Sequence, residues 1–244
     1  MEDLVYGRNS VIELLESERT VNKVFILKGE KHGSIRKIID MAKRKGLVVS
    51  EVNKSKLDEL TDNKNHQGVA AFTTPYNYVD VDDILASAKE RNEKPLIVIA
   101  ERIEDPHNLG AMIRSAECMG VHGIIIPKRR AVGITETVAK VSAGAIEHML
   151  VSRVNNINDT IEYLKEKGVW IIGTDASGRD NIDKVDLKDS VAIVIGSEGE
   201  GMSRLTRERC DILARIPMKG KVTSLNASVS CGMILYEALR QRMI

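Results

Sequence analysis

Side chains that can bind a ligand crowd into residues 215–228, which read RIPMKGKVTSLNAS. Ser224, Asn226 and Ser228 lie just before a long apolar stretch that predicts a helix. A helix start needs only one N-cap, so this turn has more polar side chains than its own backbone requires. We therefore expect a ligand to bind at this turn.

Two further segments have the composition of ligand-binding turns, and each follows an apolar run of strand length. The first reads ERIEDPHNLGAMIRS, in which Asn108 is a natural N-cap for a helix and Arg114 lies off the apolar stripe of that helix. The second follows Val191–Ile195 and has glycines at 196, 199 and 201, which let a backbone turn sharply and approach a ligand. Glu198 in this turn would repel a phosphate, so a neutral or cationic ligand is favoured.

The spacing of these glycines differs from the common nucleotide-binding motifs. The pattern is G-x-x-G-x-G, whereas dinucleotide-binding folds use G-x-G-x-x-G after their first strand. No Gly-Lys-Ser/Thr follows, so this is not a phosphate-binding P-loop. An oxidoreductase, or another nucleotide-binding α/β enzyme of those types, is therefore disfavoured. Asp175 and Asp180 flank another glycine-containing turn, where they are suited either to contact a ribose or simply to form the turn.

From Pro95 onward, the apolar pattern predicts strands that alternate with helices. Strands are expected at 96–101, 122–126, 148–153, 168–174, 190–196 and 212–216, and helices at 109–119, 135–142, 157–167, 203–209 and 227–242. This alternation predicts an α/β fold with a mostly parallel sheet and helices on both faces. Ligands of such sheets bind beyond the carboxyl ends of the strands, where the polar segments fall.

The first 74 residues predict a smaller α/β unit. We expect a helix over 11–16, a second that Ser34 caps and Gly46 ends, and a third near 56–60, with strands at 23–27, 47–52 and 68–73. Residues 75–94 contain one predicted helix between proline-containing segments, and we interpret them as a linker. The domains expected are therefore 1–74 and 95–244.

Composition and charge define the class of protein. The 244 residues are 43% hydrophobic and 29% charged, as in a globular protein, and the formal net charge is only +1. Residues 28–45 nevertheless contain seven Lys or Arg against two acidic residues, and Lys128-Arg129-Arg130 form a second basic cluster. Each cluster suits either RNA phosphates or an ordinary solvated face. Aromatic residues make up 3% of the chain, which argues against a sheet that stacks bases on exposed rings.

The cysteine pattern and the N-terminal segment predict a cytoplasmic protein. The three cysteines are far apart and include no Cys-x-x-Cys, so neither a disulfide framework nor a metal site is expected. The first residues lack the features of a signal peptide. The apolar runs are too short to span a membrane.

The three polar segments, in this order, resemble the three motifs of the SpoU (TrmH-type) class of RNA 2′-O-ribose methyltransferases in the SPOUT superfamily. The matching patterns are Asn108-x-Gly110-x-x-x-Arg114, Gly196-Ser-Glu198-Gly-x-Gly201 and Pro217-Met-x-Gly220-x-Val222-x-Ser224-Leu225-Asn226-x-Ser228. Near the start, Tyr6-Gly-Arg8 and His66-Gln67-Gly68-Val69 resemble the ribosomal-protein-like substrate-binding domain of this class. The resemblance covers nearly the whole chain and looks closest to the enzymes that methylate a guanosine of 23S ribosomal RNA.

This resemblance implies a fold, a cofactor and partners. The implied fold is a SPOUT-type α/β knot, with a deep trefoil knot in the catalytic domain, and the implied assembly is a homodimer. S-adenosylmethionine would lie among the knotted loops, near Thr174, Gly196, Ser197, Ile216, Ser224 and Leu225. The RNA would contact Arg8, Lys43, Arg44 and Lys45 of the front domain.

The resemblance also implies a reaction, an in-line attack of a ribose 2′-oxygen on the S-methyl group without a metal ion. Placement of the reacting atoms can supply about 7–11 kcal/mol. Arg114 is implied to activate the hydroxyl, but a guanidinium is a poor base. We therefore prefer an Arg114 that grips the adjacent phosphate and orients the hydroxyl. Asn108 and Asn226 would hold the loops and the hydroxyl, and Glu198 would brace Asn108 or a neighbouring arginine.

The RNA target stays open between several possibilities. Besides a 23S ribosomal RNA guanosine, these are a transfer RNA and an antibiotic-resistance site in ribosomal RNA. A non-catalytic RNA-binding protein would explain the front domain and the basic clusters, but not why all three polar motifs are complete.

Overall fold

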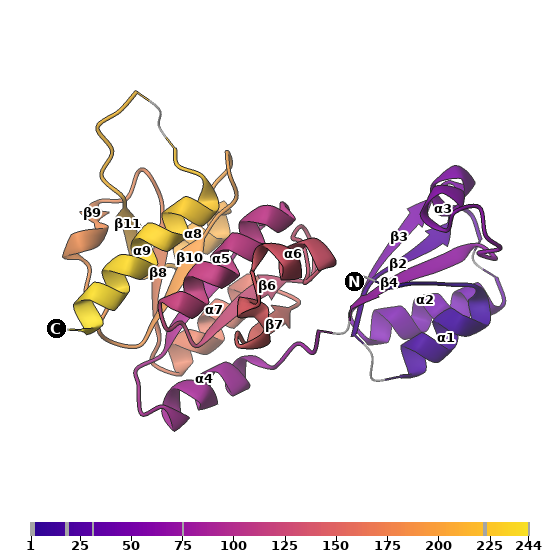
Figure 1. The fold of residues 1–244 in the computed structure, drawn as a ribbon, viewed down its shortest axis with the longest axis horizontal. Helices are drawn as coiled ribbons and strands as arrows, with labels where there is room; N and C mark the ends of the chain where they lie inside the picture. Colours follow the sequence, from indigo (N-terminus) through magenta and orange to yellow (C-terminus); the bar gives the residue numbers. More distant parts are fainter. Residues whose placement is uncertain (1–2, 18–19, 31, 75, 222–223, 244) are drawn as a thin grey trace. The chain divides into compact units, whose positions relative to one another are not determined.

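The computed structural model describes residues 3–17, 20–30, 32–74, 76–221 and 224–243. They form two compact units (Figure 1). The first contains the chain up to Asn77 together with 134–136, and the second contains 78–133 and the chain from Thr137 onward.

The first unit has a four-stranded sheet in the order β1-β4-β2-β3. Its strands are β1 (Asp3–Tyr6), β2 (Thr20–Leu27), β3 (Val48–Val52) and β4 (Val69–Thr74), and only the β2–β3 pair is parallel. Its helices are α1 (Arg8–Glu16), α2 (Ser34–Arg44) and α3 (Lys54–Leu60). Buried aliphatic side chains of α1, α2 and the sheet form one core, so the predicted α/β character of this unit is confirmed.

The structure adds one strand to this unit and corrects one helix cap. The strand β1 was not expected, because four residues are too few to show a period. Ser34 is the first residue of α2 and does not cap it. The N-cap is Gly33, which has a positive φ of 57° and makes no side-chain hydrogen bond.

The second unit has a seven-stranded sheet in the order β7-β6-β5-β10-β8-β11-β9, and every pairing in it is parallel. The strands are β5 (Leu96–Ala100), β6 (Gly123–Pro127), β7 (Val151–Val154), β8 (Trp170–Thr174), β9 (Asp180–Asn181), β10 (Val191–Ile195) and β11 (Ile212–Arg215). β5, β6 and β10 are buried at every position, as expected for strands covered on both faces. The predicted parallel sheet is confirmed, although the two-residue β9 was not foreseen.

Helices cover both faces of this sheet. They are α4 (Val81–Glu90), α5 (Pro106–Cys118), α6 (Glu136–Val141), α7 (Ile157–Glu166), α8 (Arg204–Arg209) and α9 (Ala227–Arg242), with short 3-10 helices η1 (Ala145–Glu147) and η2 (Ile182–Lys184). Alternate residues of β5 and β10 pack into one core cluster with α4 and α7. The other residues of these strands face away from that cluster. There, α5 and α9 lie side by side (Figure 1).

The segment interpreted as a linker contains α4, and Ile84 of this helix is fully buried in the core cluster of the second unit. Among the helices of the described ranges, none is long and apolar enough to cross a bilayer. The trefoil knot implied by the resemblance stays a prediction.

The topology of the second sheet gathers the polar segments. β5, β10, β8 and β11 are four consecutive neighbours in the sheet. Because parallel strands all end at the same edge, the loops that follow these four strands emerge together. These loops contain the three polar segments and the turn at Asp175.

Candidate active site

The residue that caps α5 differs from the sequence prediction, and this difference leaves Asn108 free to take part in the site. The N-cap is Asp105, whose Oδ1 accepts a hydrogen bond from the backbone amide of His107 at 2.9 Å. Pro106 follows at the first helical position, where proline costs no hydrogen bond. The expectation that Asn108 caps this helix was therefore wrong, because the Asp-Pro pair is a better start. The buried Asn108 side chain is left available for contacts outside its helix.

Asn108 uses this freedom in a network with the other two polar segments. Its Nδ2 donates a hydrogen bond of 3.0 Å to Oε1 of Glu198, and its Oδ1 accepts one of 2.9 Å from Nδ2 of Asn226. Nδ2 of Asn226 also donates to the same Glu198 oxygen. Three of the four residues predicted to be catalytic are thus in direct contact, and Glu198 braces Asn108 as expected.

Asn226 has two structural duties. It is the N-cap of α9, since its Oδ1 accepts hydrogen bonds from the backbone amides of Ser228 at 2.9 Å and Val229 at 3.1 Å. Its Nδ2 belongs to the network with Asn108 and Glu198. One end of the side chain therefore fixes the helix start, and the other fixes the helix to the site. This explains part of the surplus of polar residues in the turn.

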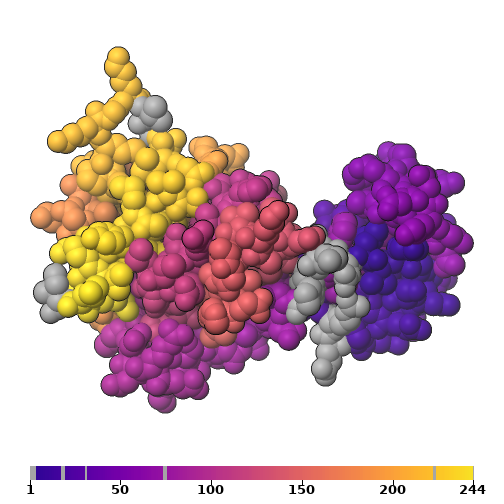
Figure 2. Space-filling view, in the orientation of Figure 1, coloured from indigo at the N-terminus to yellow at the C-terminus, as the bar shows by residue number. Residues whose placement is uncertain are grey.

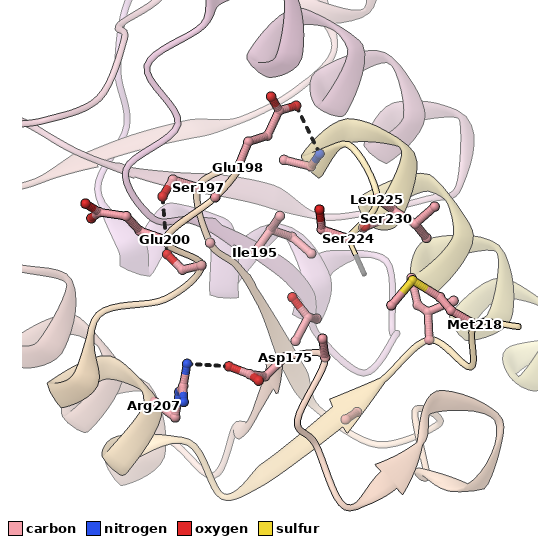
Figure 3. Close-up of a pocket in the computed structure, with 18 residues that line it drawn as sticks. Asp175, Ile195, Ser197, Glu198, Glu200, Arg207, Met218, Ser224, Leu225 and Ser230 are labelled. Carbon is pink, nitrogen blue, oxygen red and sulfur yellow. Dashed lines mark hydrogen bonds and ion pairs between the residues drawn. The ribbon is translucent and has the colours of Figure 1, made fainter. Parts of the chain in front are cut away.

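A cavity of about 430 Å³ opens between the loops that follow β8, β10 and β11 (Figure 3). Apolar side chains of Ile195, Ala214 and Met218 contribute to its walls, and so do Asp175 and Arg207. All six residues that the resemblance assigned to cofactor binding line this one cavity: Thr174, Gly196, Ser197, Ile216, Ser224 and Leu225.

The glycine loop, residues 196–201, is folded tightly on itself. Ser197 and Gly201 exchange two backbone hydrogen bonds, of 3.2 and 3.0 Å. A Cβ atom on Gly196 would lie 2.3 Å from backbone atoms of Gly201 and Met202, closer than real side chains come. Glycine is thus required here by the loop itself. A Cβ atom on Gly110 would lie 2.7 Å from the side chain of Val141, so glycine at this position allows α5 to pack closely against that residue.

A second cavity of about 400 Å³ lies against the first. Ser197, Glu198 and Glu200 line both cavities, whereas Asn108 lines only the second. Arg102 also lines the second cavity and forms an ion pair with Glu200. The hydrogen bond between Asn108 and Glu198 therefore lies at the junction of the two cavities.

Arg114 is not part of this network. It is exposed on α5, six residues after Asn108, and lines neither cavity. In the part of the chain that the structure describes, its guanidinium has no hydrogen bond or ion pair. It is therefore available to an external anion.

The structure also contains an ion pair that the sequence did not reveal. Arg207 of α8 pairs with Asp175 at 2.6 Å, and both residues line the first cavity. Asp175 was one of two aspartates considered for a ribose, whereas the other, Asp180, lies in β9 and does not line the cavity. The sequence did not point to Arg207 as a functional residue. It is one of several charged residues in α8, and such a sequence is typical of a helix face that is exposed to solvent.

The basic residues of the first unit differ in how free they are. Lys43 and Arg44 are exposed in the last turn of α2, and Nζ of the next residue, Lys45, donates to the carbonyl of Ser17 at 3.0 Å. Arg8 is more engaged. It donates to the Gln67 carbonyl and pairs with Glu30, each over 2.9 Å.

These features define an α/β enzyme with a ligand cavity at the carboxyl ends of parallel strands, and comparison with known proteins identifies its family. Residues 95–236 match the model described as the SpoU rRNA Methylase family. Residues 4–79 match the model described as RNA 2′-O ribose methyltransferase substrate binding. The chain belongs to the SpoU methylase family.

Similar proteins cover nearly the whole chain. The putative TrmH family tRNA/rRNA methyltransferase YacO of Bacillus subtilis (strain 168) is 48% identical over 98% of this chain and 96% of its own length. The SpoU methyltransferase AviRb from Streptomyces viridochromogenes, solved in complex with AdoMet, aligns with 26% identity and a TM-score of 0.64 over 99% of this chain and 91% of its own. The TrmH/SpoU tRNA modifying enzyme of A. aeolicus aligns with 31% identity and a TM-score of 0.57, over 66% of this chain and 84% of its own.

The protein is therefore an RNA methyltransferase that uses S-adenosylmethionine, and its first cavity has the chemistry that this cofactor needs. Ile195, Ile216 and Leu225 offer apolar contacts to an adenine. Of the described residues in the lining, none is a lysine, and the one arginine is paired with Asp175. Such a lining tolerates a positively charged sulfonium. Among the described residues, no group of three His, Cys, Asp or Glu is arranged to hold a metal ion.

Proposed function

We propose that this protein methylates the ribose 2′-hydroxyl of a guanosine in 23S ribosomal RNA. The observation that carries the proposal is the Asn108–Glu198–Asn226 network, because it joins the cavity suited to the cofactor to a second cavity that Asn108 lines, where the target ribose would lie. The match of residues 4–79 to a 2′-O-ribose substrate-binding model supports the same reaction.

The residues of this chain have distinct tasks in the proposed reaction. S-adenosylmethionine, when bound in the first cavity, supplies an electrophilic methyl group. The network holds the loops of both cavities in one geometry, which lowers the barrier mainly through positioning. Glu198 accepts hydrogen bonds from the two asparagine amides at its Oε1, so we assign it the role of a brace. Arg114, with its free guanidinium, grips a phosphate of the RNA and so orients the target hydroxyl.

The extent of the alignments sets this chain apart from one tRNA-modifying relative. The tRNA modifying enzyme of A. aeolicus leaves about a third of this chain uncovered, a length similar to that of the first unit. AviRb and the B. subtilis relative align over the whole chain. The first unit matches a substrate-binding model, so it would give this protein a different RNA target from that tRNA-modifying relative.

Mapping of 2′-O-methylated nucleotides tests the proposed target. RNA from a strain that lacks the gene should lose one 2′-O-methylguanosine from 23S ribosomal RNA, and the cloned gene should restore it. Loss of a transfer RNA methylation instead would favour the alternative target. Loss of a base methylation would contradict the 2′-O-ribose reaction itself.

We also propose that the enzyme is a homodimer that associates through α9. Helix α9, yellow in Figure 2, lies at the surface of the second unit. Val229, Met233 and Tyr236 lie along one side of it at helical spacing and are 47–60% exposed. A stripe of exposed apolar side chains of this kind marks an interface. It begins close to Leu225, which lines the first cavity, so association would also shield the cofactor site.

Light scattering with two variants tests the dimer. Met233→Glu should convert the protein to a monomer, because it buries a charge in the proposed interface. Leu205→Glu is the matched control, since Leu205 is 48% exposed on α8, away from the stripe. A Met233→Glu protein that stays dimeric, or a wild-type protein that is monomeric at micromolar concentration, would contradict the proposal.

A further inference from the structure

Asp175 lies directly after β8, in a turn that fixes its backbone and one of its carboxylate oxygens. Its N–H donates to the Ala214 carbonyl and its own carbonyl accepts from Gly178, each over 2.9 Å. Its Oδ1 accepts two hydrogen bonds from Ser177, at 2.8 Å from the backbone amide and 2.6 Å from Oγ. The carboxylate is therefore held in one orientation against the cofactor cavity before a ligand arrives.

The other carboxylate oxygen belongs to the ion pair with Arg207, which Figure 3 shows on the side of the cavity away from Ser224 and Leu225. Arg207 uses one terminal nitrogen for this pair. Its Nε is buried and has no hydrogen-bond partner among the described residues. A buried N–H without a partner costs about 1–3 kcal/mol, so such groups are rare in proteins and call for an explanation.

A turn alone does not explain this arrangement. An asparagine at 175 would accept the same two hydrogen bonds from Ser177, and it would need no arginine. A carboxylate has about four acceptor sites, of which Ser177 fills two and Arg207 one. One acceptor site at Oδ2 remains for a donor on a ligand in the cavity. The hydrogen bonds from Ser177 and the charge of Arg207 outweigh burial and lower the pKa of Asp175, so the carboxylate is ionised at neutral pH.

A free carboxylate acceptor at the wall of the cavity is complementary to a hydroxyl group, which can donate to it. Adjacent hydroxyls occur in the cofactor only on its ribose, and acidic side chains bind ribose hydroxyls in other nucleotide-binding folds. The amino-acid end of the cofactor is a poorer match. An ion pair has no net charge to attract a zwitterion, and the α-carboxylate would compete with Asp175 for the guanidinium.

We propose that Asp175 accepts a hydrogen bond from a ribose hydroxyl of S-adenosylmethionine, and that Arg207 positions the carboxylate for it. This inference rests on the cofactor site proposed above. The proposal adds two residues to that site. Asp175 contacts the cofactor, and Arg207 acts through Asp175.

Calorimetry with S-adenosylhomocysteine, without RNA, tests the contact. Asp175→Asn keeps the acceptor for Ser177 but replaces the free acceptor by a donor, so affinity should fall about 10- to 100-fold, as for one lost hydrogen bond to a charged group. The 2′-deoxy and 3′-deoxy analogues of S-adenosylhomocysteine each lack one ribose hydroxyl. For the analogue that lacks the bound hydroxyl, the affinities of wild type and Asp175→Asn should agree within about twofold. With 5′-methylthioadenosine, which lacks the amino-acid end, the loss should persist.

Arg207→Met provides an independent variant that leaves the turn intact, and it should weaken S-adenosylhomocysteine binding about 3- to 30-fold. Arg204→Met is the matched control, because Arg204 is on the same helix with its side chain 90% exposed. Equal losses for Asp175→Asn with both deoxy analogues would overturn the proposal, and so would a loss that disappears with 5′-methylthioadenosine. A wild-type protein that binds the cofactor but methylates no ribose would contradict only the proposed function.

Discussion

The side-chain amide of Asn226 donates a hydrogen bond of 2.9 Å to Oδ1 of Asn108, although 118 positions separate the two residues in the chain. This bond ties the start of α9 to the first turns of α5. Both amides also donate to Oε1 of Glu198 from the glycine loop. Hydrogen bonds from side-chain amides therefore hold these three segments together at the junction between the two cavities.

Asn226→Asp separates the two duties of this residue. An aspartate caps a helix as well as an asparagine does, so α9 should keep its N-cap in this variant. The variant has no amide to donate and places a second carboxylate beside Glu198. Methylation should therefore fall at least about 100-fold, measured as kcat with saturating cofactor and RNA. Asn226→Ser, which also caps, is the control for the loss of the amide without the added charge.

Arg114→Ala should abolish methylation while S-adenosylhomocysteine affinity stays within about twofold of wild type. The reason is that Arg114 lines neither cavity and forms no hydrogen bond or ion pair within the described chain. Its removal should also leave the melting temperature unchanged, because exposed side chains contribute little to stability. Single-turnover methylation and calorimetry measure the two effects. Normal turnover by this variant would show that Arg114 is not a catalytic residue.

The sequence predicted the parallel sheet well, for a physical reason. Strands such as Leu96–Ala100 are apolar at every position because they are covered on both faces, and this pattern is local. Strand order is not local. That β10 lies between β5 and β8 follows from contacts over nearly a hundred residues, so the adjacency of the polar loops had to be inferred from a general rule.

Within the site, the sequence pointed to several residues that the structure brings together, but it did not always predict what each of them does. Asn108 was expected to cap α5, but Asp105 and Pro106 take the start of that helix, and the asparagine enters the network instead. Arg207 was missed altogether. Its importance depends on a partner 32 positions away in a different loop, which no spacing within α8 could indicate.

Charge reversal at Lys43, Arg44 and Lys45 should weaken RNA binding without lowering cofactor affinity. If these side chains neutralise phosphates of single-stranded RNA, the slope of log K against log salt should become shallower by about 0.7 for each phosphate that the variant no longer neutralises. Filter binding over a range of salt concentrations measures this slope. Reversal at Lys89, which lies on α4 of the second unit, is the control. An unchanged RNA affinity would remove the α2 terminus from the interface.

Gly196→Ala should abolish cofactor binding and destabilise the second unit. The added methyl group would lie 2.3 Å from the backbone of Gly201 and Met202, and a backbone cannot move aside as a flexible side chain can. A cost of about 1–3 kcal/mol is expected in chemical denaturation. Gly232→Ala is the matched control, because the nearest heavy atom to its added methyl is Ser115 Oγ at 3.7 Å. Equal stability of the two variants would contradict the tight fold of the glycine loop.

The three cysteines should differ sharply in reactivity, because the thiolate is the reactive form. Burial raises the pKa of Cys231 to about 12, and burial together with the charges of Asp211 and Glu101 raises the pKa of Cys210 to about 12. At pH 8, only about 1 in 10⁴ of either thiol is ionised. Cys118 is exposed on α5 and should account for the whole fast phase with a disulfide reagent.

Cys118→Ser should abolish this fast phase, and unfolding in guanidinium should release the slow thiols. Raising the pH from 7 to 9 should increase the slow rates of Cys210 and Cys231 about tenfold per pH unit, because their folded pKa values lie well above this range. A slow rate that does not depend on pH in this way would mean that opening of the fold, and not ionisation, limits the reaction. Fast labelling of Cys231 in the native wild-type protein would contradict the burial of α9 against the sheet, since Cys231 lies fully buried in that helix.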